Sequence, residues 1–134
     1  EDVWHSILST LCAVAGAQMI IVPSASPARG FSGELIGNHD RYLRMIRAVA
    51  EEHGVFLMNP QLTGFEGGKG FIGGSTIVDP YGKILASAEV NEDSMILAEV
   101  DLTMVAVTRS QLPLVTDLQS AWGDIQDIVA RLEP

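Results

Sequence analysis

A short apolar segment near the start of the chain runs directly into small hydroxyl residues and a cation. Residues 19–22 are all apolar, Pro23 follows them, residues 24–26 read Ser-Ala-Ser, and Arg29 lies three positions further on. Four apolar residues are too few for a helix but typical of a strand buried on both faces, and Pro23 is expected to end its backbone pairing. In open α/β sheets, ligands bind beyond the carboxyl ends of the strands. The segment is therefore either one wall of a pocket or an ordinary strand exit with a solvated Arg29.

A glycine-rich segment, residues 68–73, has the spacing G-x-G-x-x-G but lacks the context that this motif requires. A dinucleotide site needs a helix N-terminus behind the glycines, whereas residues 74–78 are rich in β-branched side chains and predict a strand. The same segment fails as a phosphate-binding P-loop, because Thr63 replaces the first glycine and Gly70 replaces the hydroxyl residue that binds magnesium. Glu66, in the same loop, either lines a pocket or is a solvated loop acid.

The sequence has neither the spacing of a metal site nor that of a serine hydrolase. The three histidines, His5, His39 and His53, are scattered along the chain, and Ser26 lacks the G-x-S-x-G pattern around it. Cys12 has no histidine near it in the sequence to activate it. Its place in a predicted helix, beside apolar residues, indicates a small buried hydrophobe.

The composition indicates one compact, acidic domain. The chain has 134 residues, 47% of them hydrophobic, and 17 acidic against 8 basic side chains give a net charge of −9. This charge argues against general binding of nucleic acid or of anionic membrane surfaces, which requires clustered cations. No apolar run is long enough to span a bilayer, and no basic segment marks a signal peptide. A lone cysteine favours a reducing, cytoplasmic setting.

Hydrophobic spacing predicts alternating helices and strands first, and mainly strands later. The predicted helices cover residues 6–15, with Ser6 as N-cap, 38–53, a short stretch within 101–109, and 116–132. The predicted strands cover residues 19–22, 55–59, 74–78, 83–88 and 95–100, and residues 24–37 and 62–73 are predicted loops. The order helix, glycine, apolar strand occurs twice, around Gly16 and Gly54, which is typical of a layered α/β fold. We expect the later strands to form an antiparallel meander.

Two helical surfaces have contrasting patterns. Arg41, Arg44 and Arg47 are spaced three residues apart, which indicates a solvated cationic face paired with acids such as Glu51. The last helix has a continuous apolar face made of Leu118, Ala121, Trp122, Ile125, Ile128, Val129 and Leu132. An apolar face on a terminal helix covers either the chain's own core or a partner subunit.

Short motifs along the whole chain occur in the order found in one protein family. The first are residues 1–5, Glu-Asp-Val-Trp-His, and residues 20–27, Ile-Ile-Val-Pro-Ser-Ala-Ser-Pro. The others are Arg47-Ala48, Glu51, Val55-Phe56, Asn59, Gly64, Glu66, Phe71, Gly73, Ser75, Asp79-Pro80, Gly82, Asp101-Leu102, Arg109, Pro113 and Asp117. Together they resemble the nitrilase, or carbon–nitrogen hydrolase, superfamily. Trp4 with His5, and the Ser-Ala-Ser-Pro segment, lean toward its glutaminase-type members, which supply ammonia to a nicotinamide-dinucleotide synthetase. Aliphatic amidases and carbamoyl-amide hydrolases remain alternatives.

The resemblance implies an α-β-β-α sandwich, of which this chain forms half or more, and hydrolysis of amides, nitriles or related C–N bonds without a metal or cofactor. The family uses a Glu-Lys-Cys triad, and its cysteine stands immediately before the acidic pair that Glu1-Asp2 resembles. Its Glu and Lys lie further upstream, while Lys69, Lys83 and Cys12 occupy the wrong segments to replace the triad. We therefore expect residues 1–134 to be the C-terminal portion of a single hydrolase domain, inactive when isolated.

The same resemblance implies roles for residues within the chain. The backbone N–H of Glu1 would be an oxyanion donor, Trp4 would form a pocket wall, and Ala25, Ser26 and Arg29 would meet the substrate. The implied partners are a small amide or nitrile substrate, the upstream half of the same domain, and further copies of the chain in a homo-oligomer. Such a half-domain would expose an apolar sheet edge.

A function of a different class also fits the sequence. In this alternative, the chain is a non-catalytic binding or assembly module that keeps the hydrolase scaffold. It would associate through its C-terminal helix, with Trp122 in the interface. The two hypotheses differ in whether catalytic residues from elsewhere complete the pocket.

Overall fold

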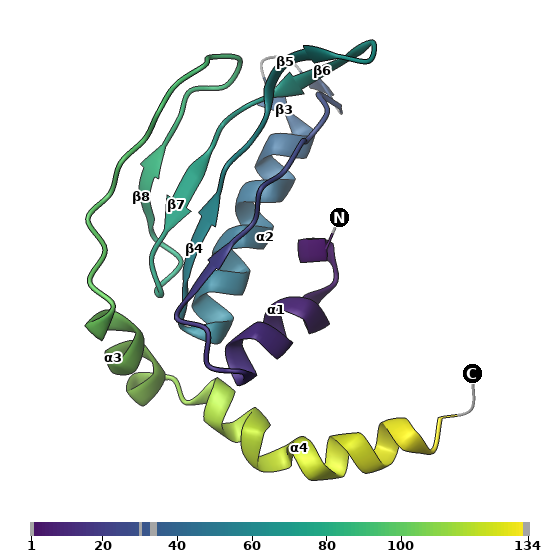
Figure 1. Ribbon diagram of the computed structural model, residues 1–134, viewed down its shortest axis with the longest axis vertical. Helices are drawn as coiled ribbons and strands as arrows, with labels where there is room; N and C mark the ends of the chain where they lie inside the picture. Colours follow the sequence, from purple (N-terminus) through teal and green to yellow (C-terminus); the bar gives the residue numbers. More distant parts are fainter. Residues whose placement is uncertain (1, 30, 33–34, 133–134) are drawn as a thin grey trace.

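The computed structural model describes residues 2–29, 31–32 and 35–132 of the chain (Figure 1). The helices are η1 Asp2–Trp4, a short 3₁₀ helix, α1 Ser6–Val14, α2 Gly37–His53, α3 Thr103–Gln111 and α4 Leu114–Ala130. The strands are β1 Met19–Ile21, β2 Phe31–Ser32, β3 Leu35–Ile36, β4 Phe56–Asn59, β5 Thr63–Glu66, β6 Lys69–Ile72, β7 Thr76–Val78 and β8 Ile84–Ser87. None of these helices is long and apolar enough to cross a membrane.

A four-stranded sheet in the order β1-β4-β7-β8 forms the centre of the molecule (Figure 1). β1 runs parallel to β4, with Ile20 opposite Leu57, whereas β7 is antiparallel to both β4 and β8. The helix α2 packs on one face of the sheet, and the core cluster consists of Val3, Tyr42, Ile46, Val49, Ala50, Leu57 and Val78. Because β1 and β4 are parallel, their carboxyl ends lie at the same edge of the sheet.

The long helix α2 follows from apolar residues at helical spacing. Tyr42, Ile46 and Val49 recur every three or four residues and are buried. Gly54 ends the helix with a positive φ of 56°, and a Cβ atom there would lie 3.0 Å from the side chain of Arg109. The predicted helix and its glycine stop are confirmed, and the helix starts one residue earlier than predicted.

The segment predicted as a glycine-rich loop, residues 62–73, is instead a β-hairpin made of β5 and β6. Gly67 and Gly68 lie at its turn with φ angles of 57° and 75°, the left-handed region that a two-residue hairpin turn requires. Phe65 pairs with Gly70 across the hairpin, and a Cβ atom at Gly70 would lie 3.2 Å from the Phe65 ring. The glycines therefore permit a tight turn and close packing between two strands.

The predicted hairpin at residues 74–88 is confirmed by β7 and β8. The Asp79 carboxylate accepts hydrogen bonds from the backbone N–H groups of Tyr81 and Lys83, both at 2.9 Å, and so closes the turn. A strand, β7, follows the G-x-G-x-x-G segment, and this agrees with the rejection of a dinucleotide motif there.

The predicted strand at residues 95–100 is wrong. This segment runs beside β8 without joining any ladder of the described residues (Figure 1). Met95 and Leu97 alternate with less exposed neighbours and are 83% and 80% exposed. The alternation that favours a strand is present, but a strand also needs a partner for its backbone groups.

Three expectations near the N-terminus are also wrong. The strand β1 is not buried on both faces, because it is the edge strand of the sheet and Ile21 is 58% exposed. His5, not Ser6, occupies the N-cap position of α1, and its side chain makes no capping hydrogen bond. Cys12 is exposed rather than buried, because it faces an open cavity between α1 and β1.

The cationic face of α2 agrees in part with the pairing to acids that its spacing predicts. Arg44 forms an ion pair with Asp40, one turn earlier in the helix. Arg47 Nε donates a 2.8 Å hydrogen bond to the carbonyl of Gly82, whereas the spacing predicts an ion pair with Glu51. One arginine of this face therefore joins α2 to the turn between β7 and β8.

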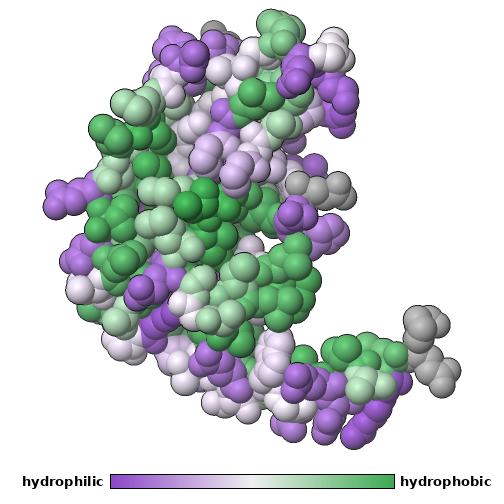
Figure 2. Space-filling model, viewed as in Figure 1, coloured by the Kyte–Doolittle hydropathy of each residue, from purple (hydrophilic) through white to green (hydrophobic). Residues whose placement is uncertain are grey.

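The terminal helix α4 extends away from the sheet, and Figure 2 shows apolar residues gathered along one side of it (Figures 1 and 2). Val115 in its first turn is buried, and Gln119 Nε2 donates a 3.1 Å hydrogen bond to the carbonyl of Val14 in α1. Further along, Ile128 and Val129 are exposed. Because most of this face does not cover the chain's own core, a partner subunit remains the prediction for it.

His39, in the first turn of α2, is partly buried against the backbone of Gly74. Its Nε2 atom is buried without a hydrogen-bond partner among the described residues, and a Cβ atom at Gly74 would lie only 2.6 Å from it. Burial disfavours the imidazolium ion and lowers the pKa of His39 below 6.5, while the Asp40 carboxylate opposes part of this shift. The fold therefore favours neutral His39.

We predict that acidification below about pH 6.5 destabilises the fold through His39. Because the pKa of His39 is lower in the folded chain than in the unfolded chain, the unfolded chain binds the extra proton first. The free energy of unfolding is then fully maintained above the unfolded pKa and falls as the pH drops towards the folded pKa. His39→Gln should flatten this dependence in urea unfolding between about pH 7.5 and about pH 5. The exposed control His5→Gln should not, and equal flattening in both variants would contradict the assignment.

Candidate functional site

Backbone pairing between the β1 and β4 segments continues past the ends of both strands. The Val22 N–H donates to the carbonyl of Met58, and the Ser24 N–H donates to that of Pro60, both at 2.8 Å. Pro23 lies between these two donors, at a position whose N–H this ladder does not use. The prediction that Pro23 ends the pairing is therefore wrong, and residues 22–24 remain fixed to the neighbouring segment.

The segment that follows β1, residues 22–29, is called the exit segment below. The hairpin β5–β6 holds its other side. The Ala28 N–H donates to the carbonyl of Gly70 at 2.9 Å, and the Ile72 N–H donates to the carbonyl of Ser26 at 3.4 Å. Residues 24–28 are therefore held by backbone hydrogen bonds from two directions.

The exit segment forms one wall of an open cavity of about 670 Å³. Its lining residues are Trp4, His5, Pro23, Ser24, Ala25, Ser26, Pro27, Arg29, Asn38 and Tyr42. The four residues predicted to contact the substrate, Trp4, Ala25, Ser26 and Arg29, thus lie around one cavity. The predicted oxyanion donor, the backbone N–H of Glu1, lies outside the described residues. The role of the four residues in substrate binding stays a prediction.

Aromatic contacts hold Trp4 at this cavity. Its ring meets the ring of Tyr42 edge to face, with the centroids 5.2 Å apart. The guanidinium carbon of Arg41 lies 5.1 Å from the centroid of the Trp4 ring, which is a cation–π contact. Trp4 itself is exposed, so part of its ring is available to a ligand. Arg41, predicted as part of a solvated face, therefore helps to place the aromatic wall.

The charge of the described residues that line the cavity is opposite in sign to the net charge of the chain. Arg29 is the one permanently cationic side chain among the described lining residues, and none of these is acidic, although the chain carries a net charge of −9. Asn38, at the start of α2, ties the helix to this wall. Its Nδ2 donates to the Pro27 carbonyl at 3.0 Å and its backbone N–H donates to the Arg29 carbonyl at 3.2 Å. The described residues of the lining therefore favour a neutral or anionic group over a cation.

Ser26 is only 3% exposed, and this limits the contact that it can make. Its hydroxyl oxygen is buried and has no hydrogen-bond partner in the part of the chain that the structure describes. An unpartnered buried hydroxyl costs about 1–3 kcal/mol. A ligand that reached this oxygen would supply the hydrogen-bond partner that it lacks among the described residues.

Residues beyond the predicted set also form or support the cavity. The supporting residues among them are Asn59 and Gln61, and the lining residues are His5, Pro23, Ser24, Pro27, Asn38 and Tyr42. A signal for Asn59 exists in the sequence, because Asn59 ends its strand just as Ser24 follows the neighbouring one, and the ends of parallel neighbours lie together. Tyr42 has no such signal, because its spacing in α2 indicates only a buried helix face.

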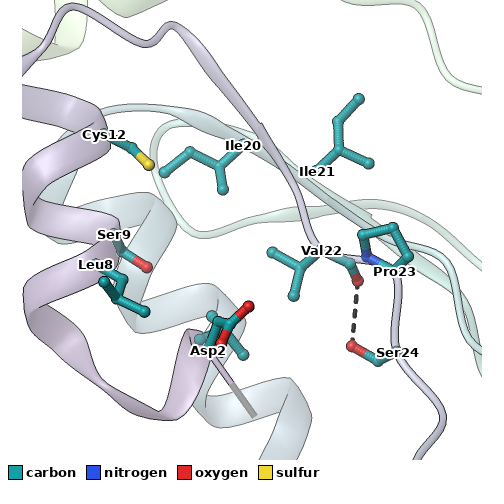
Figure 3. Close-up of a pocket in the computed structure, with 10 residues that line it drawn as sticks. Asp2, Leu8, Ser9, Cys12, Ile20, Ile21, Val22, Pro23 and Ser24 are labelled. Atoms are coloured by element: carbon teal, nitrogen blue, oxygen red, sulfur yellow. Dashed lines mark hydrogen bonds between the residues drawn. The ribbon is translucent and has the colours of Figure 1, made fainter.

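Cys12 and Glu66 do not line this cavity. Figure 3 shows Cys12 in a second cavity, of about 310 Å³, where its sulfur is directed towards Ile20 of β1. Glu66 is exposed in β5, where it pairs with Lys69 across the hairpin. Of the two roles that the sequence leaves open for Glu66, the solvated acid agrees with this position.

Comparison with known proteins identifies the family to which this fold belongs. A sequence model described as carbon-nitrogen hydrolase matches residues 1–110, and the chain belongs to this family. Among solved structures, the chain is similar to the carbon-nitrogen hydrolase from Helicobacter pylori G27, with a TM-score of 0.78 and 27% sequence identity over 87% of this chain and 43% of that one. The predicted resemblance and the α/β fold of the nitrilase type are confirmed.

Two curated relatives are similar in sequence. The chain is 28% identical to a glutamine-dependent NAD(+) synthetase of Rhodobacter capsulatus over 126 residues, which are 94% of this chain and 21% of the relative. It is 30% identical to the chloroplastic omega-amidase of Arabidopsis thaliana over 115 residues, which are 84% of this chain and 29% of the relative. The chain thus matches less than a third of the length of either relative. Their names agree with the predicted similarity to glutaminase-type members.

Proposed function

We propose that the chain supplies the substrate-positioning part of a cysteine-dependent hydrolase that cleaves a non-peptide C–N bond and releases ammonia. The bond would be that of an amide, a nitrile or a glutamine side-chain amide. Membership of the carbon-nitrogen hydrolase family supports the reaction class. The observation that carries the proposal is that Trp4, Ala25, Ser26 and Arg29 surround one cavity at a strand exit. In this role, residues 1–134 are the C-terminal portion of a single hydrolase domain.

The groups that break the bond would come from outside these 134 residues. In the mechanism that the family implies, a cysteine thiolate attacks the carbon, a glutamate transfers protons, and a lysine stabilises the developing oxyanion. Cys12 faces a different cavity, and neither Lys69 nor Lys83 is among the described residues that line the first one. The exposure of Ile21 and Met95 supports this proposal, because a further layer of the domain would cover them.

The described lining fits the amide and carboxylate groups of a substrate such as glutamine, and it offers no acidic partner to the ammonium group that glutamine also carries. Arg29 lies in a lining without an acidic side chain among the described residues, so it can pair with a carboxylate without competition from them. Trp4 and Tyr42 would cover the aliphatic part of such a substrate. The names of the two curated relatives support the same substrate class.

The proposal is tested on the full encoded polypeptide that contains these residues. We expect a cysteine immediately before Glu1 and ammonia release from glutamine or from a simple aliphatic amide. Replacing that cysteine by serine should abolish the release, because the nucleophile is lost. The 134-residue chain alone should release no ammonia. Ammonia release by the isolated chain, or another residue before Glu1, would contradict the proposal.

Arg29 provides a test of the substrate class. Arg29→Leu should raise the KM for glutamine about tenfold or more, because a hydrogen bond to a charged group contributes about 1.5–3 kcal/mol. The same variant should leave the KM for an uncharged aliphatic amide nearly unchanged, and Arg29→Lys should keep part of the preference. Steady-state ammonia assays with both substrates measure this difference. Arg131→Leu, at the end of α4, is the matched control. An equal change for both substrates would exclude a carboxylate contact at Arg29.

One observation favours the alternative function, a non-catalytic assembly module. The apolar face of α4 faces α1 across a groove of about 400 Å³ that Ile7, Leu11, Trp122 and Ile125 help to line. Burial of this face against a further copy of the chain would explain its composition and would form the expected homo-oligomer.

Truncation tests whether this helix mediates association. Removal of residues 116–134 should convert an oligomer to a monomer, because the exposed apolar face is lost with them. Size-exclusion chromatography with light scattering measures the change. A variant with Asp124→Ala, on the same helix, should still associate. Full association of the truncated chain would place the interface elsewhere.

A further inference from the structure

The side chain of Gln61 contacts the cavity wall, which we define as residues 23–29. The contact is with the backbone N–H of Ser26. Gln61 Oε1 accepts a 3.3 Å hydrogen bond from the Ser26 N–H, and its Nε2 donates a 2.8 Å hydrogen bond to Asn59 Oδ1. Its own backbone N–H donates to Ser75 Oγ at 2.9 Å, which fixes Gln61 to the start of the β7 segment. We propose that Gln61 is a positioning residue that sets the backbone of residues 24–26 and thereby the shape of the substrate cavity. This inference rests on the function proposed above.

The backbone of the wall is held by hydrogen bonds to residues outside it. Pro23 and Pro27 have no N–H group to donate. Between them, the Ser24 N–H bonds to the backbone of Pro60, whereas the Ser26 N–H bonds to a side chain, that of Gln61. One point of attachment of the wall can therefore be changed by substitution without altering the wall's own sequence.

Asn59 anchors the other end of the Gln61 amide. Asn59 is buried, and its Nδ2 donates to the carbonyl of Val22 at 2.7 Å and to Ser24 Oγ at 3.0 Å. A chain of hydrogen bonds thus starts at the Val22 carbonyl, passes through two amide side chains, and ends at the Ser26 N–H. We call Asn59 and Gln61 the amide relay.

The orientation of the amide relay is fixed by the backbone at both ends. A carbonyl only accepts hydrogen bonds, so the nitrogen of Asn59 must face Val22. The Asn59 oxygen then faces Gln61, which must present its own nitrogen there. That arrangement leaves the Gln61 oxygen facing the Ser26 N–H, which only donates. Each group has a partner of the opposite kind, and reversing either amide would place two acceptors or two donors together.

This directionality makes Gln61→Glu a more informative change than its small size suggests. A carboxylate at position 61 still accepts from the Ser26 N–H, but it presents a second acceptor to Asn59 Oδ1. Asn59 cannot turn to relieve this contact, because its nitrogen is held by Val22. The facing oxygens disfavour the charged form and raise the pKa of the new carboxyl group. Once protonated, the group donates to Asn59 as glutamine does, so the wall should recover at acidic pH.

The first experiment measures the wall directly, without catalysis. Amide hydrogen exchange at Ser26, followed by NMR on the 134-residue chain, should be about fivefold to tenfold faster in Gln61→Met, the factor expected for one net hydrogen bond. Gln119→Met is the matched control, because the Gln119 side chain also bonds to a backbone group, the Val14 carbonyl to which it donates, but lies on α4. Unchanged exchange at Ser26 in Gln61→Met, or an equal increase in the control, would overturn the proposal.

The second experiment measures substrate binding in the full encoded polypeptide. Gln61→Met should raise the KM for the preferred amide about fivefold to tenfold, with kcat within about twofold of the wild type. Gln61→Glu should raise the KM at neutral pH and regain the wild-type value as the pH falls through the pKa of the new carboxyl group, relative to wild type at each pH. If Gln61→Glu only destabilised the fold, its KM would not return to the wild-type value at acidic pH.

The two experiments separate failure of this inference from failure of the proposed function. If the full polypeptide hydrolyses no amide or nitrile, the proposed function fails, while exchange at Ser26 still decides whether Gln61 holds the wall. If exchange at Ser26 increases but the KM stays unchanged, Gln61 holds the wall without shaping the site, and the positioning role is overturned. Faster exchange in Gln61→Met together with a KM for Gln61→Glu that recovers in acid is the expected result.

Discussion

The parallel pairing of β1 with β4 is the contact on which the candidate site depends. It brings the ends of both strands to one edge of the sheet, so that the hydroxyl residues after β1 lie beside Asn59 at the end of β4 and Gln61 just after it. The core under α2 fixes β4 in turn, since Leu57 is fully buried there. Displacement of β4 would therefore move the cavity wall with it, although no catalytic group is involved.

The hairpin β5–β6 supports the same wall from the opposite side. Its glycine spacing resembles a phosphate-binding motif, but the glycines serve a packing requirement. Gly70 leaves room for the Phe65 ring on the neighbouring strand, and its carbonyl receives the hydrogen bond from Ala28. A Cβ atom at this position would lie 3.2 Å from the Phe65 ring, which is 93% exposed and would have to turn slightly away. The same glycine spacing thus has a structural use here, because the next element in the chain is a strand and not a helix.

Local sequence patterns predicted the elements whose partners are close in sequence or repeat at a regular period. The helix α2 follows from its apolar spacing and Gly54, and the β7–β8 hairpin follows from the turn at Asp79. The gathering of Trp4, Ala25 and the neighbouring wall residues around one cavity followed from the strand-end rule together with the family resemblance. Neither source predicted the amide relay in full, because its bonds join residues up to 37 positions apart. Such long-range pairing is decided by register, which composition does not report.

The incorrect predictions follow a pattern with a physical meaning. The sequence predicts burial for both faces of β1 and for Cys12, and a paired strand at residues 95–100. The structure instead leaves Ile21, Cys12, Met95 and Leu97 exposed. Apolar side chains stabilise a fold when other parts of the protein cover them, and exposed apolar patches often mark a contact with another surface. An unpaired apolar edge strand also favours aggregation. These exposed side chains lie at the β1 edge of the sheet and beside β8. The further layer of the domain proposed above would cover them. The exposed residues Ile128 and Val129 lie on a different element, α4, and the oligomer proposed above would cover them instead.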